Sequence, residues 1–310
     1  MENTSTPTRQ VAAGELVTLL DFVRYAVSRF VEARLVFAHG TTDPVAEAAF
    51  LVCEALHLYP DQFSTFATAR LTAGEAERVL QLIDLRVTTR KPAAYLVNKV
   101  YMRGLPFHVD DRVIVPRSFL GEILDCHFDD EDYALMETRS VRRVLDLCTG
   151  SGCLAILAAR QFPDAVIDAV DISPGALEVA QRNVAVYGLK DRITLHQGDL
   201  FAPLSTADDA RYDVIISNPP YVDAAGMAAL PPECRAEPAI ALDGGADGLD
   251  VVRRIITEAS AHLAPGGGLL CEVGRGRARI EEAFPSLSLL WLDSEDSIGE
   301  VFWVTADDLS

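Results

Sequence analysis

Apolar residues recur at helical spacing in the N-terminal part of the chain. In the first segment they return every three or four positions, which places them on one face of a helix. These residues are Leu16, Leu19, Leu20, Val23, Val27 and Phe30. A second helix is predicted over 46–58, because Asp43 can cap its first turn and Pro44 suits the first helical position.

A third helix is predicted to begin at Thr72, since Glu75 follows three residues later in the pattern of a capping box. Its apolar positions are Val79, Leu82, Ile83 and Val87. None of the three helical segments carries a motif associated with chemistry. We therefore expect residues 1–92 to form a small helical domain.

The pattern changes to strict alternation between Pro92 and Pro116. Segments 101–107 and 107–115 alternate apolar with polar residues, as the two strands of a hairpin do. This predicts a β-hairpin linker over 93–122, whose last residues, 116–122, lead into a short helix. The stretch 127–138 carries five acidic residues and is expected to be a solvated loop or helix face.

From Arg142 onward, predicted strands alternate with predicted helices. The strands are expected at 144–147, 165–170, 193–196, 214–217 and 268–273, with helices such as 151–161 and 174–187 between them. Such alternation predicts an α/β fold with a mostly parallel sheet covered by helices on both faces. The last two strands, 287–292 and 301–305, are joined by a link too short for a crossover helix. They should pair antiparallel, which places an antiparallel C-terminal strand in the domain 123–310.

Composition identifies the chain as a globular protein with room for two domains. Of its 310 residues, 49% are hydrophobic and 24% are charged. The 27 Lys and Arg residues and 46 Asp and Glu residues give a net charge of −19. This charge argues against a protein that binds DNA through phosphate contacts, and against an anionic membrane surface. It favours a cationic partner.

Cysteine usage and the N-terminus indicate a reduced, cytoplasmic location. The six cysteines contain no pair with the spacing of a zinc ribbon or a redox motif. Residues 1–14 are polar and do not form a signal peptide, and no stretch is long and apolar enough to span a membrane. We found no grouping of metal ligands in the sequence, so no metal is expected.

The first candidate site is the segment Asp146-Leu-Cys-Thr-Gly-Ser-Gly152, which lies between a predicted strand and a predicted helix. Its glycines allow the backbone to approach a ligand closely, and the helix start offers free N–H groups. Asp171 ends the next strand, where an acid can accept hydrogen bonds from both hydroxyls of a ribose. Together these residues predict an adenosine-bearing cofactor.

Two cofactors fit this pattern. Gly150, Gly152 and Ala155 satisfy the dinucleotide fingerprint of NAD, with Asp171 at about the expected distance of twenty residues. In enzymes that use S-adenosylmethionine, an acid before the glycines, here Asp146, faces the methionine ammonium, and an acid after the third strand, here Asp199, holds the adenine. The three acids at strand ends favour S-adenosylmethionine. The expected cofactor contacts are Asp146, Thr149, Gly150, Gly152, Asp171, Ile172, Asp199, Leu200 and Asn218.

The second candidate site, Asn218-Pro-Pro-Tyr221, directly follows the fourth strand. The two prolines fix the backbone and remove two donors, which leaves the Pro219 carbonyl as an acceptor beside the side-chain oxygen of Asn218. Two acceptors of this kind fit a planar NH2 group, and Tyr221 can lie flat on the attached π-system. Methyl transfer to an amide or exocyclic amine nitrogen is the chemistry that these residues suit.

The Asn-Pro-Pro-Tyr motif resembles that of the amino-methylating, S-adenosylmethionine-dependent methyltransferases. Nearly the whole chain is similar to one family among them, the protein-glutamine N5-methyltransferases. The further segments that carry this resemblance are Tyr95-Leu96, Arg103-Gly104, Phe107, Val115-Pro-Arg117, Glu237-Pro238, Ala241-Leu242, Asp247-Gly-Leu-Asp250 and Glu272-Val-Gly274. The resemblance implies a Rossmann-like methyltransferase domain joined by a hairpin to an N-terminal helical domain, which would dock a protein substrate.

That family has two bacterial branches. One methylates the glutamine of the GGQ motif in peptide-chain release factors, and the other a glutamine in large-subunit ribosomal protein L-three. Release-factor enzymes typically read Pro-Arg-Pro-x-Thr-Glu where this chain has Pro116-Arg-Ser-Phe-Leu-Gly-Glu122, and carry glycine in place of Cys148. Both departures resemble the ribosomal-protein branch, as do segments 146–153 and 227–233. The net charge of −19 suits this basic ribosomal protein before it is buried in RNA, so we expect the free ribosomal protein or an assembly intermediate as substrate.

By the same resemblance, Asn218, Pro219, Pro220 and Tyr221 are expected to be catalytic. Arg117 and Glu122 either support the site or form ordinary surface ion pairs, and Glu237 and Glu272 either support it or form buried pairs. The alternatives to the ribosomal-protein branch are a release-factor methylase, a nucleic-acid amino-methyltransferase, an NAD-dependent oxidoreductase and a non-catalytic ribosome-assembly protein.

Overall fold

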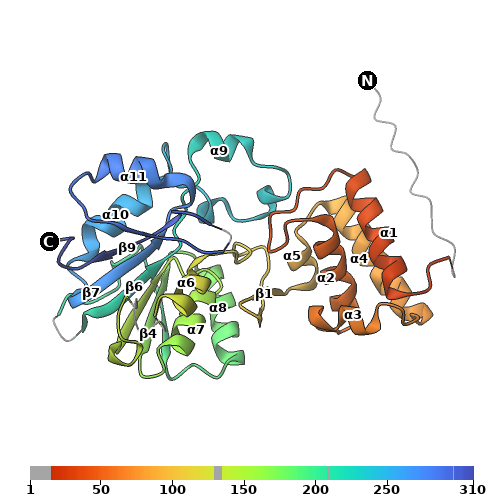
Figure 1. The fold of residues 1–310 in the computed structure, drawn as a ribbon, viewed down its shortest axis with the longest axis horizontal. Helices are drawn as coiled ribbons and strands as arrows, with labels where there is room; N and C mark the ends of the chain where they lie inside the picture. Colours follow the sequence, from red (N-terminus) through yellow and green to blue (C-terminus); the bar gives the residue numbers. More distant parts are fainter. Residues whose placement is uncertain (1–14, 129–134, 208–209, 296) are drawn as a thin grey trace. The chain divides into compact units, whose positions relative to one another are not determined.

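The computed structural model describes residues 15–128, 135–207, 210–295 and 297–310 (Figure 1). The chain divides into two compact units, one ending at Val97 and the other spanning Asn98–Ser310. The polar segment 1–14 and most of the acidic stretch 127–138, namely 129–134, lie outside the described residues. Each unit is described separately below.

The first unit is helical, and its helix starts agree with the sequence. Its elements are α1 (Leu19–Glu32), α2 (Pro44–Ala55), η1 (Pro60–Gln62), α3 (Phe63–Phe66), α4 (Ala73–Thr89) and α5 (Ala93–Val97). Asp43 caps α2 by accepting from two backbone N–H groups. Thr72 and Glu75 form the predicted capping box of α4. These side chains satisfy N–H groups that have no partner within their own helix.

The core of this unit is formed mainly by α1, α2 and α4. Leu19, Val23 and Phe30 of α1 are buried as predicted, but Leu20 is 51% exposed and lies off the buried face. Within the core, the Arg86 guanidinium of α4 donates to the Glu47 carboxylate of α2 at 2.7 Å. Two buried charges are tolerated because each neutralises the other.

The second unit begins with a hairpin that is shorter than predicted. Strands β1 (Val100–Met102) and β2 (Leu105–Phe107) pair antiparallel around Arg103 and Gly104, which both have positive φ. The prediction of one strand over 101–107 and a second over 107–115 was wrong, because the chain turns at Arg103 and Gly104 inside the first of these segments. The Asp110 carboxylate accepts from both the backbone N–H and the guanidinium of Arg112, which closes a turn inside the second segment. Helix α6 (Leu120–Cys126) follows, as expected.

A seven-stranded sheet forms the body of the second unit. Its strands are β3 (Arg143–Leu147), β4 (Val166–Asp171), β5 (Ile193–Gln197), β6 (Tyr212–Ser217), β7 (Leu263–Glu272), β8 (Leu290–Leu292) and β9 (Val301–Thr305). The helices are α7 (Cys153–Gln161), α8 (Pro174–Val186), α9 (Ala224–Ala229), α10 (Asp250–Ala259) and α11 (Arg277–Ala283). Short 3-10 turns are η2 (Thr138–Ser140), η4 (Cys234–Ala236), η5 (Ala239–Ala241) and η6 (Gly274–Gly276).

The strand order β5-β4-β3-β6-β7-β9-β8 confirms the α/β class and the mostly parallel sheet. Strands β3 to β7 are parallel, whereas β9 lies between β7 and β8 and is antiparallel to both. The order reverses between β3 and β6. In open α/β sheets, ligands bind outside the carboxyl ends of the strands at such a reversal.

Strand β7 begins at Leu263, five residues before the predicted start at Gly268. The first part of this strand was not predicted because it contains a run of glycines, and glycine contributes no alternating side chains. At Gly268 the missing side chain has a use. A Cβ there would lie 2.2 Å from the Trp303 ring of β9, so only glycine allows this close approach.

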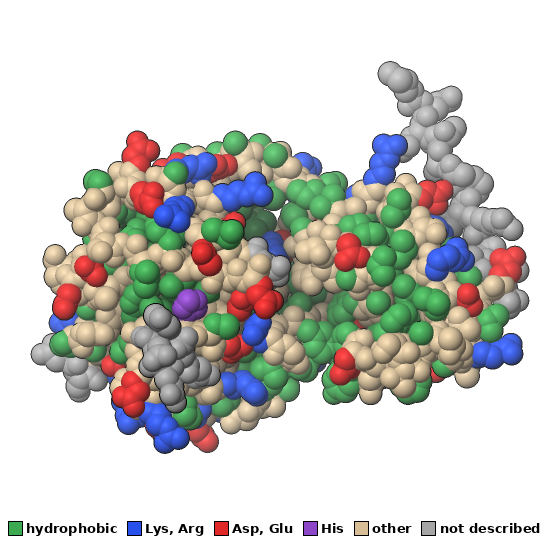
Figure 2. Space-filling model, in the orientation of Figure 1, with side chains coloured by type: hydrophobic (Ala, Val, Ile, Leu, Met, Phe, Trp, Pro, Cys, Tyr) green, Lys and Arg blue, Asp and Glu red, His purple; other side chains and the backbone are tan. Residues whose placement is uncertain are grey.

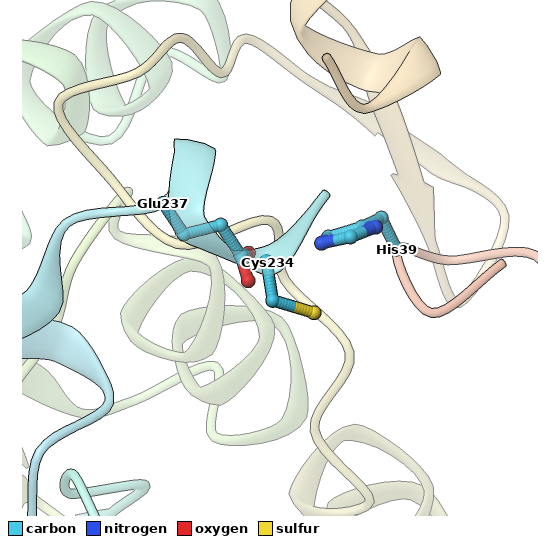
Figure 3. A group of neighbouring side chains, drawn as sticks. All are labelled: His39, Cys234 and Glu237. Carbon is cyan, nitrogen blue, oxygen red and sulfur yellow. The ribbon is translucent and has the colours of Figure 1, made fainter. Parts of the chain in front are cut away.

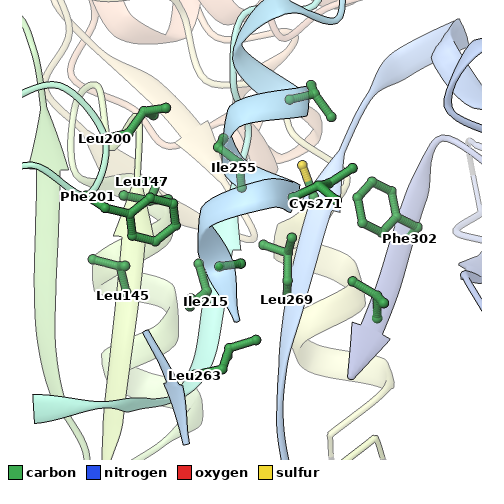
Figure 4. Packing of buried hydrophobic residues seen from close by; sticks show 14 of the residues in the cluster. Leu145, Leu147, Leu200, Phe201, Ile215, Ile255, Leu263, Leu269, Cys271 and Phe302 are labelled. Atoms are coloured by element: carbon green, nitrogen blue, oxygen red, sulfur yellow. The ribbon is translucent and has the colours of Figure 1, made fainter. Parts of the chain in front are cut away.

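Apolar side chains from the strands and α10 form a continuous core in this unit (Figure 4). Leu145, Ile215 and Leu269 come from neighbouring strands, and Ile255 of α10 packs with them. All four are fully buried. This packing fixes the sheet, and with it the positions of the strand ends that carry the candidate site.

Acidic and basic side chains both occur across the face shown in Figure 2. Among the described residues, no helix combines the length and apolar character needed to cross a membrane.

Candidate active site

A pocket of about 490 Å3 opens at the carboxyl ends of the parallel strands. This volume suits a small-molecule cofactor. Every residue that lines it belongs to the second unit, and the lining falls mainly into segments 112–118, 148–154, 170–173, 198–200, 218–222 and 238–243. The pocket thus brings together both motifs identified in the sequence.

The glycine loop follows β3 and starts α7. Gly150 and Gly152 both have positive φ, as expected of a tight strand-to-helix turn. A Cβ on Gly152 would lie 3.1 Å from the Cβ of Ala180, so this glycine also lets α8 pack closely against the loop. Cys148 has a φ of 59°, a conformation that favours glycine. Glycine would adopt this backbone conformation without the strain that a cysteine Cβ adds.

Asp171 lies in the pocket wall at the end of β4. Its carboxylate accepts from the backbone N–H of Gly150 at 2.8 Å and from that of Ser173 at 2.8 Å. The glycine loop is therefore tied to the next strand by this one side chain. Burial raises the pKa of Asp171, while the hydrogen bonds oppose that shift. Each oxygen retains acceptor capacity, which fits the hydroxyls of a ribose.

Asp146 is fully buried and does not line the pocket. Its Oδ2 atom accepts from the Thr149 hydroxyl at 2.5 Å and from the backbone N–H of Ala155 at 3.0 Å. Its Oδ1 atom has no hydrogen-bond partner among the described residues. Asp146 therefore supports the glycine loop from within, and its unpaired oxygen is suited to a cationic group.

Replacing Asp146 by asparagine should change how stability depends on pH. Burial raises the pKa of Asp146 to about 7 from an ordinary value of 3.8. Between these values the folded chain binds a proton that the unfolded chain does not, so the free energy of unfolding falls as pH rises through this window. Asp146→Asn lacks this term, and we expect it to gain stability relative to the parent between about pH 5 and about pH 8.

Urea unfolding of both ligand-free proteins at those two pH values measures this gain. If the two proteins keep the same difference in stability at both values, the assignment of the raised pKa to Asp146 is wrong.

Asp199 and Ile172 are both placed in the pocket wall, as predicted. Ile172 is 50% exposed and offers an apolar surface for a base. The Asp199 carboxylate is occupied by a bidentate ion pair with Arg254 of α10, with both N–O distances at 3.0 Å. Arg254 also lines the pocket and was not foreseen, because nothing in the sequence pattern links α10 to the end of β5. Leu200 is buried beside them.

Asn218 directly follows β6, whose last residue, Ser217, donates from its hydroxyl to the Leu147 carbonyl of β3 at 3.0 Å. The side chain of Asn218 has no hydrogen-bond partner among the described residues, and the same is true of the Pro219 carbonyl. Asn218, Pro219 and Pro220 all line the pocket. Two acceptors adjacent in the chain thus stand free at its wall.

Tyr221 is held by its ring and by its hydroxyl. The hydroxyl donates to Oε1 of Glu272 at 3.0 Å, and burial raises the pKa of Tyr221 well above its ordinary value. A Cβ on Gly274 would lie 2.7 Å from the ring, so the ring packs directly against that glycine. The tyrosine stays neutral and fixed, which suits a stacking surface better than an acid or base.

The sequence left open whether four charged residues support the site, and the structure places them at different positions relative to the pocket. Arg117 lines the pocket and forms a bidentate ion pair with the buried Glu237, at 2.7 and 2.8 Å. Glu122 does not line the pocket, and its carboxylate accepts from the backbone N–H of Glu295. Figure 3 shows Glu237 beside Cys234 within the second unit.

The pocket wall fits S-adenosylmethionine, with ribose acceptors at Asp171 and an apolar surface at Ile172, while the unpaired carboxylate oxygen of Asp146 lies buried beneath the glycine loop. Together with the sheet order, these residues define an S-adenosylmethionine-dependent methyltransferase. The family model for the methyltransferase small domain matches residues 131–230.

Two relatives that align over nearly their whole length identify the family within this class of methyltransferases. The chain is 71% identical to a ribosomal protein uL3 glutamine methyltransferase of Bradyrhizobium diazoefficiens, over 97% of this chain and 94% of that protein. A protein of the same name from Bordetella pertussis is 52% identical, over 96% of this chain and 97% of that protein. The chain belongs to the family of ribosomal protein uL3 glutamine methyltransferases. This membership confirms the predicted family and branch, and the NAD alternative is wrong.

A solved structure agrees with the fold. The catalytic domain of hMettl16, in complex with a MAT2A 3'UTR hairpin, superposes with a TM-score of 0.51 over 82% of this chain and 89% of that chain. The two sequences are 17% identical, so this likeness concerns the fold alone.

Proposed function

We propose that this enzyme methylates the side-chain amide nitrogen of a glutamine in ribosomal protein uL3. Family membership supports the reaction and the substrate. The observation that carries the chemistry is the pair of free acceptors, the Asn218 side chain and the Pro219 carbonyl, at the pocket wall. A primary amide presents two N–H donors, which this pair can receive.

An amide nitrogen is a poor nucleophile because its lone pair is delocalised into the carbonyl group. S-adenosylmethionine supplies, when bound, an electrophilic methyl group on a sulfonium sulfur, and its transfer to the amide nitrogen releases one amide proton. Asn218 and Pro219 would orient the amide and draw electron density toward its nitrogen by accepting both N–H groups. Acceleration would then come from positioning and from prearranged dipoles rather than from a strong base.

The surroundings of the pocket support this mechanism. The thiol of Cys148 lines the pocket, but burial raises its pKa strongly, so it stays protonated and is no nucleophile. Asp171 and the glycine loop would hold the adenosine part of the cofactor, and Tyr221 would stack on the amide plane. Asp146 would contribute negative charge beneath the loop, and Asp199 with Arg254 would border the base.

The net charge of −19 suits a basic ribosomal protein as the partner. We propose that the N-terminal helical domain docks this protein, since it carries no motif associated with chemistry and the residues that line the pocket all belong to the second unit. Modification would take place in the cytoplasm, on free uL3 or on an assembly intermediate that still exposes the glutamine.

Transfer of labelled methyl from S-adenosylmethionine to purified uL3 tests this proposal, with a release factor assayed in parallel and mass spectrometry to locate the label. We expect one labelled glutamine in uL3 and no label on the release factor. Label on the release factor alone would keep the chemistry and overturn the substrate. Absence of label on both proteins would overturn the proposed reaction.

A further inference from the structure

Glu272 ends β7 and is buried, with 1% of its surface exposed, yet it does not line the pocket. Its Oε1 atom accepts from the Tyr221 hydroxyl at 3.0 Å. Its Oε2 atom accepts from the Ser118 hydroxyl at 2.6 Å and from the backbone N–H of Phe119 at 3.0 Å. One carboxylate therefore holds three donors, and no ion pair among the described residues neutralises its charge.

These donors belong to two separate segments of the pocket wall. Tyr221 ends the Asn-Pro-Pro-Tyr motif, and Ser118 ends the wall segment 112–118. Both residues line the pocket, while the Glu272 carboxylate joins them from outside it. Displacing this carboxylate would release the Tyr221 hydroxyl and the 118–119 backbone together.

Burying a carboxylate without a cation costs desolvation free energy, and this cost is reflected in the raised pKa of Glu272. Desolvation raises the pKa of Glu272 to about 6, although all three hydrogen bonds favour the ionised form. A residue serving only to fill the core could be apolar at this position at lower cost. A carboxylate is suited instead to receiving three converging donors, since it offers acceptor sites on both oxygens.

We propose that Glu272 is a positioning residue for methyl transfer, which fixes Tyr221 and the 118–119 segment in the arrangement that receives the glutamine amide. This inference rests on the proposed function and names how the site is kept in place. Tyr221 is two residues beyond Pro219. A shift of Tyr221 would therefore also move the Pro219 carbonyl, which is one of the two proposed acceptors for the amide. The cofactor contacts of Asp171 and the glycine loop do not involve Glu272, and they should be unaffected.

The test is Glu272→Gln, because glutamine keeps the size of the side chain but places an NH2 donor where one carboxylate oxygen was. If its remaining oxygen still receives Ser118 and Phe119, the NH2 group faces Tyr221, and the tyrosine hydroxyl loses the acceptor to which it donated. We expect kcat for uL3 to fall about tenfold or more, since a hydrogen bond to a charged group is lost. The Kd for S-adenosylmethionine should stay within about twofold, measured by calorimetry.

Tyr221→Phe removes the same hydrogen bond from the other side. Its loss of kcat should match that of Glu272→Gln, and the double variant should be no slower than either single variant, because both changes break one interaction. Glu281→Gln is the matched control, since Glu281 forms an exposed pair with Arg277 on α11. It should leave kcat unchanged.

Additive losses in the double variant, or an unchanged kcat for Glu272→Gln, would overturn the positioning role. Equal loss of cofactor binding and activity would also overturn it, because that pattern marks general unfolding. The proposed function is judged separately with Asn218→Ala. If Asn218→Ala is inactive while Glu272→Gln is normal, only the present inference fails; if Asn218→Ala is fully active, the proposed acceptor pair fails.

Discussion

Asn218→Ala should lower the rate of methyl transfer to uL3 by about a hundredfold or more, because it removes one of two acceptors for the amide N–H groups. The affinity for S-adenosylmethionine should change little, since the Asn218 side chain has no contact that holds the glycine loop or Asp171. Labelled methyl transfer gives the rate, and calorimetry gives the cofactor affinity. A variant that methylates at the parent rate would contradict the mechanism.

The conservative variant Asn218→Asp sharpens this test. Aspartate keeps an oxygen acceptor at the same distance from the backbone, so it should retain more activity than the alanine variant. A merely structural role for Asn218 predicts the opposite order, because a half-buried charge disturbs a fold more than a small apolar side chain. Thermal unfolding of both variants would show whether either change acts through stability.

Local sequence pattern was enough to place most of the fold. The capped starts of α2 and α4, and the alternation of strands and helices from β3 to β6, depend on residues close together in the chain. The strand expected over 107–115 failed for a local reason as well. Val109, Val113 and Val115 alternate and are buried, but the turn at Asp110 takes their backbone out of a ladder.

The sequence predicted those site residues that lie at strand ends. It did not predict contacts between residues that are far apart in the chain and are brought together by packing. Asp171 and Asn218 follow strands, so their place at one edge of the sheet could be foreseen. The bond from Arg254 to Asp199, and that from Ser118 to Glu272, join residues 55 and 154 positions apart. No periodicity in the sequence records such pairs, which is why Arg254 was missed and Glu272 was left open.

Two acidic residues of strand β4 have different surroundings, and only one of them faces the pocket. Asp171 and Asp168 both belong to β4, but only Asp171 lines the pocket. Asp168 accepts instead from His196, Arg143 and Tyr212. Asp168 therefore serves as a control for Asp171, because it is a carboxylate of the same strand that lies away from the pocket.

Asp171→Ala should weaken the binding of S-adenosylmethionine by about a hundredfold or more, since it removes charged acceptors for the ribose and releases the Gly150 and Ser173 N–H groups. Asp168→Asn is the control, and should leave cofactor affinity within about threefold even if it lowers stability. Calorimetric titration of both variants measures the affinities. Equal losses would mean that Asp171 acts only through the stability of β4, whereas loss in Asp171→Ala alone would establish that the end of this strand holds the cofactor.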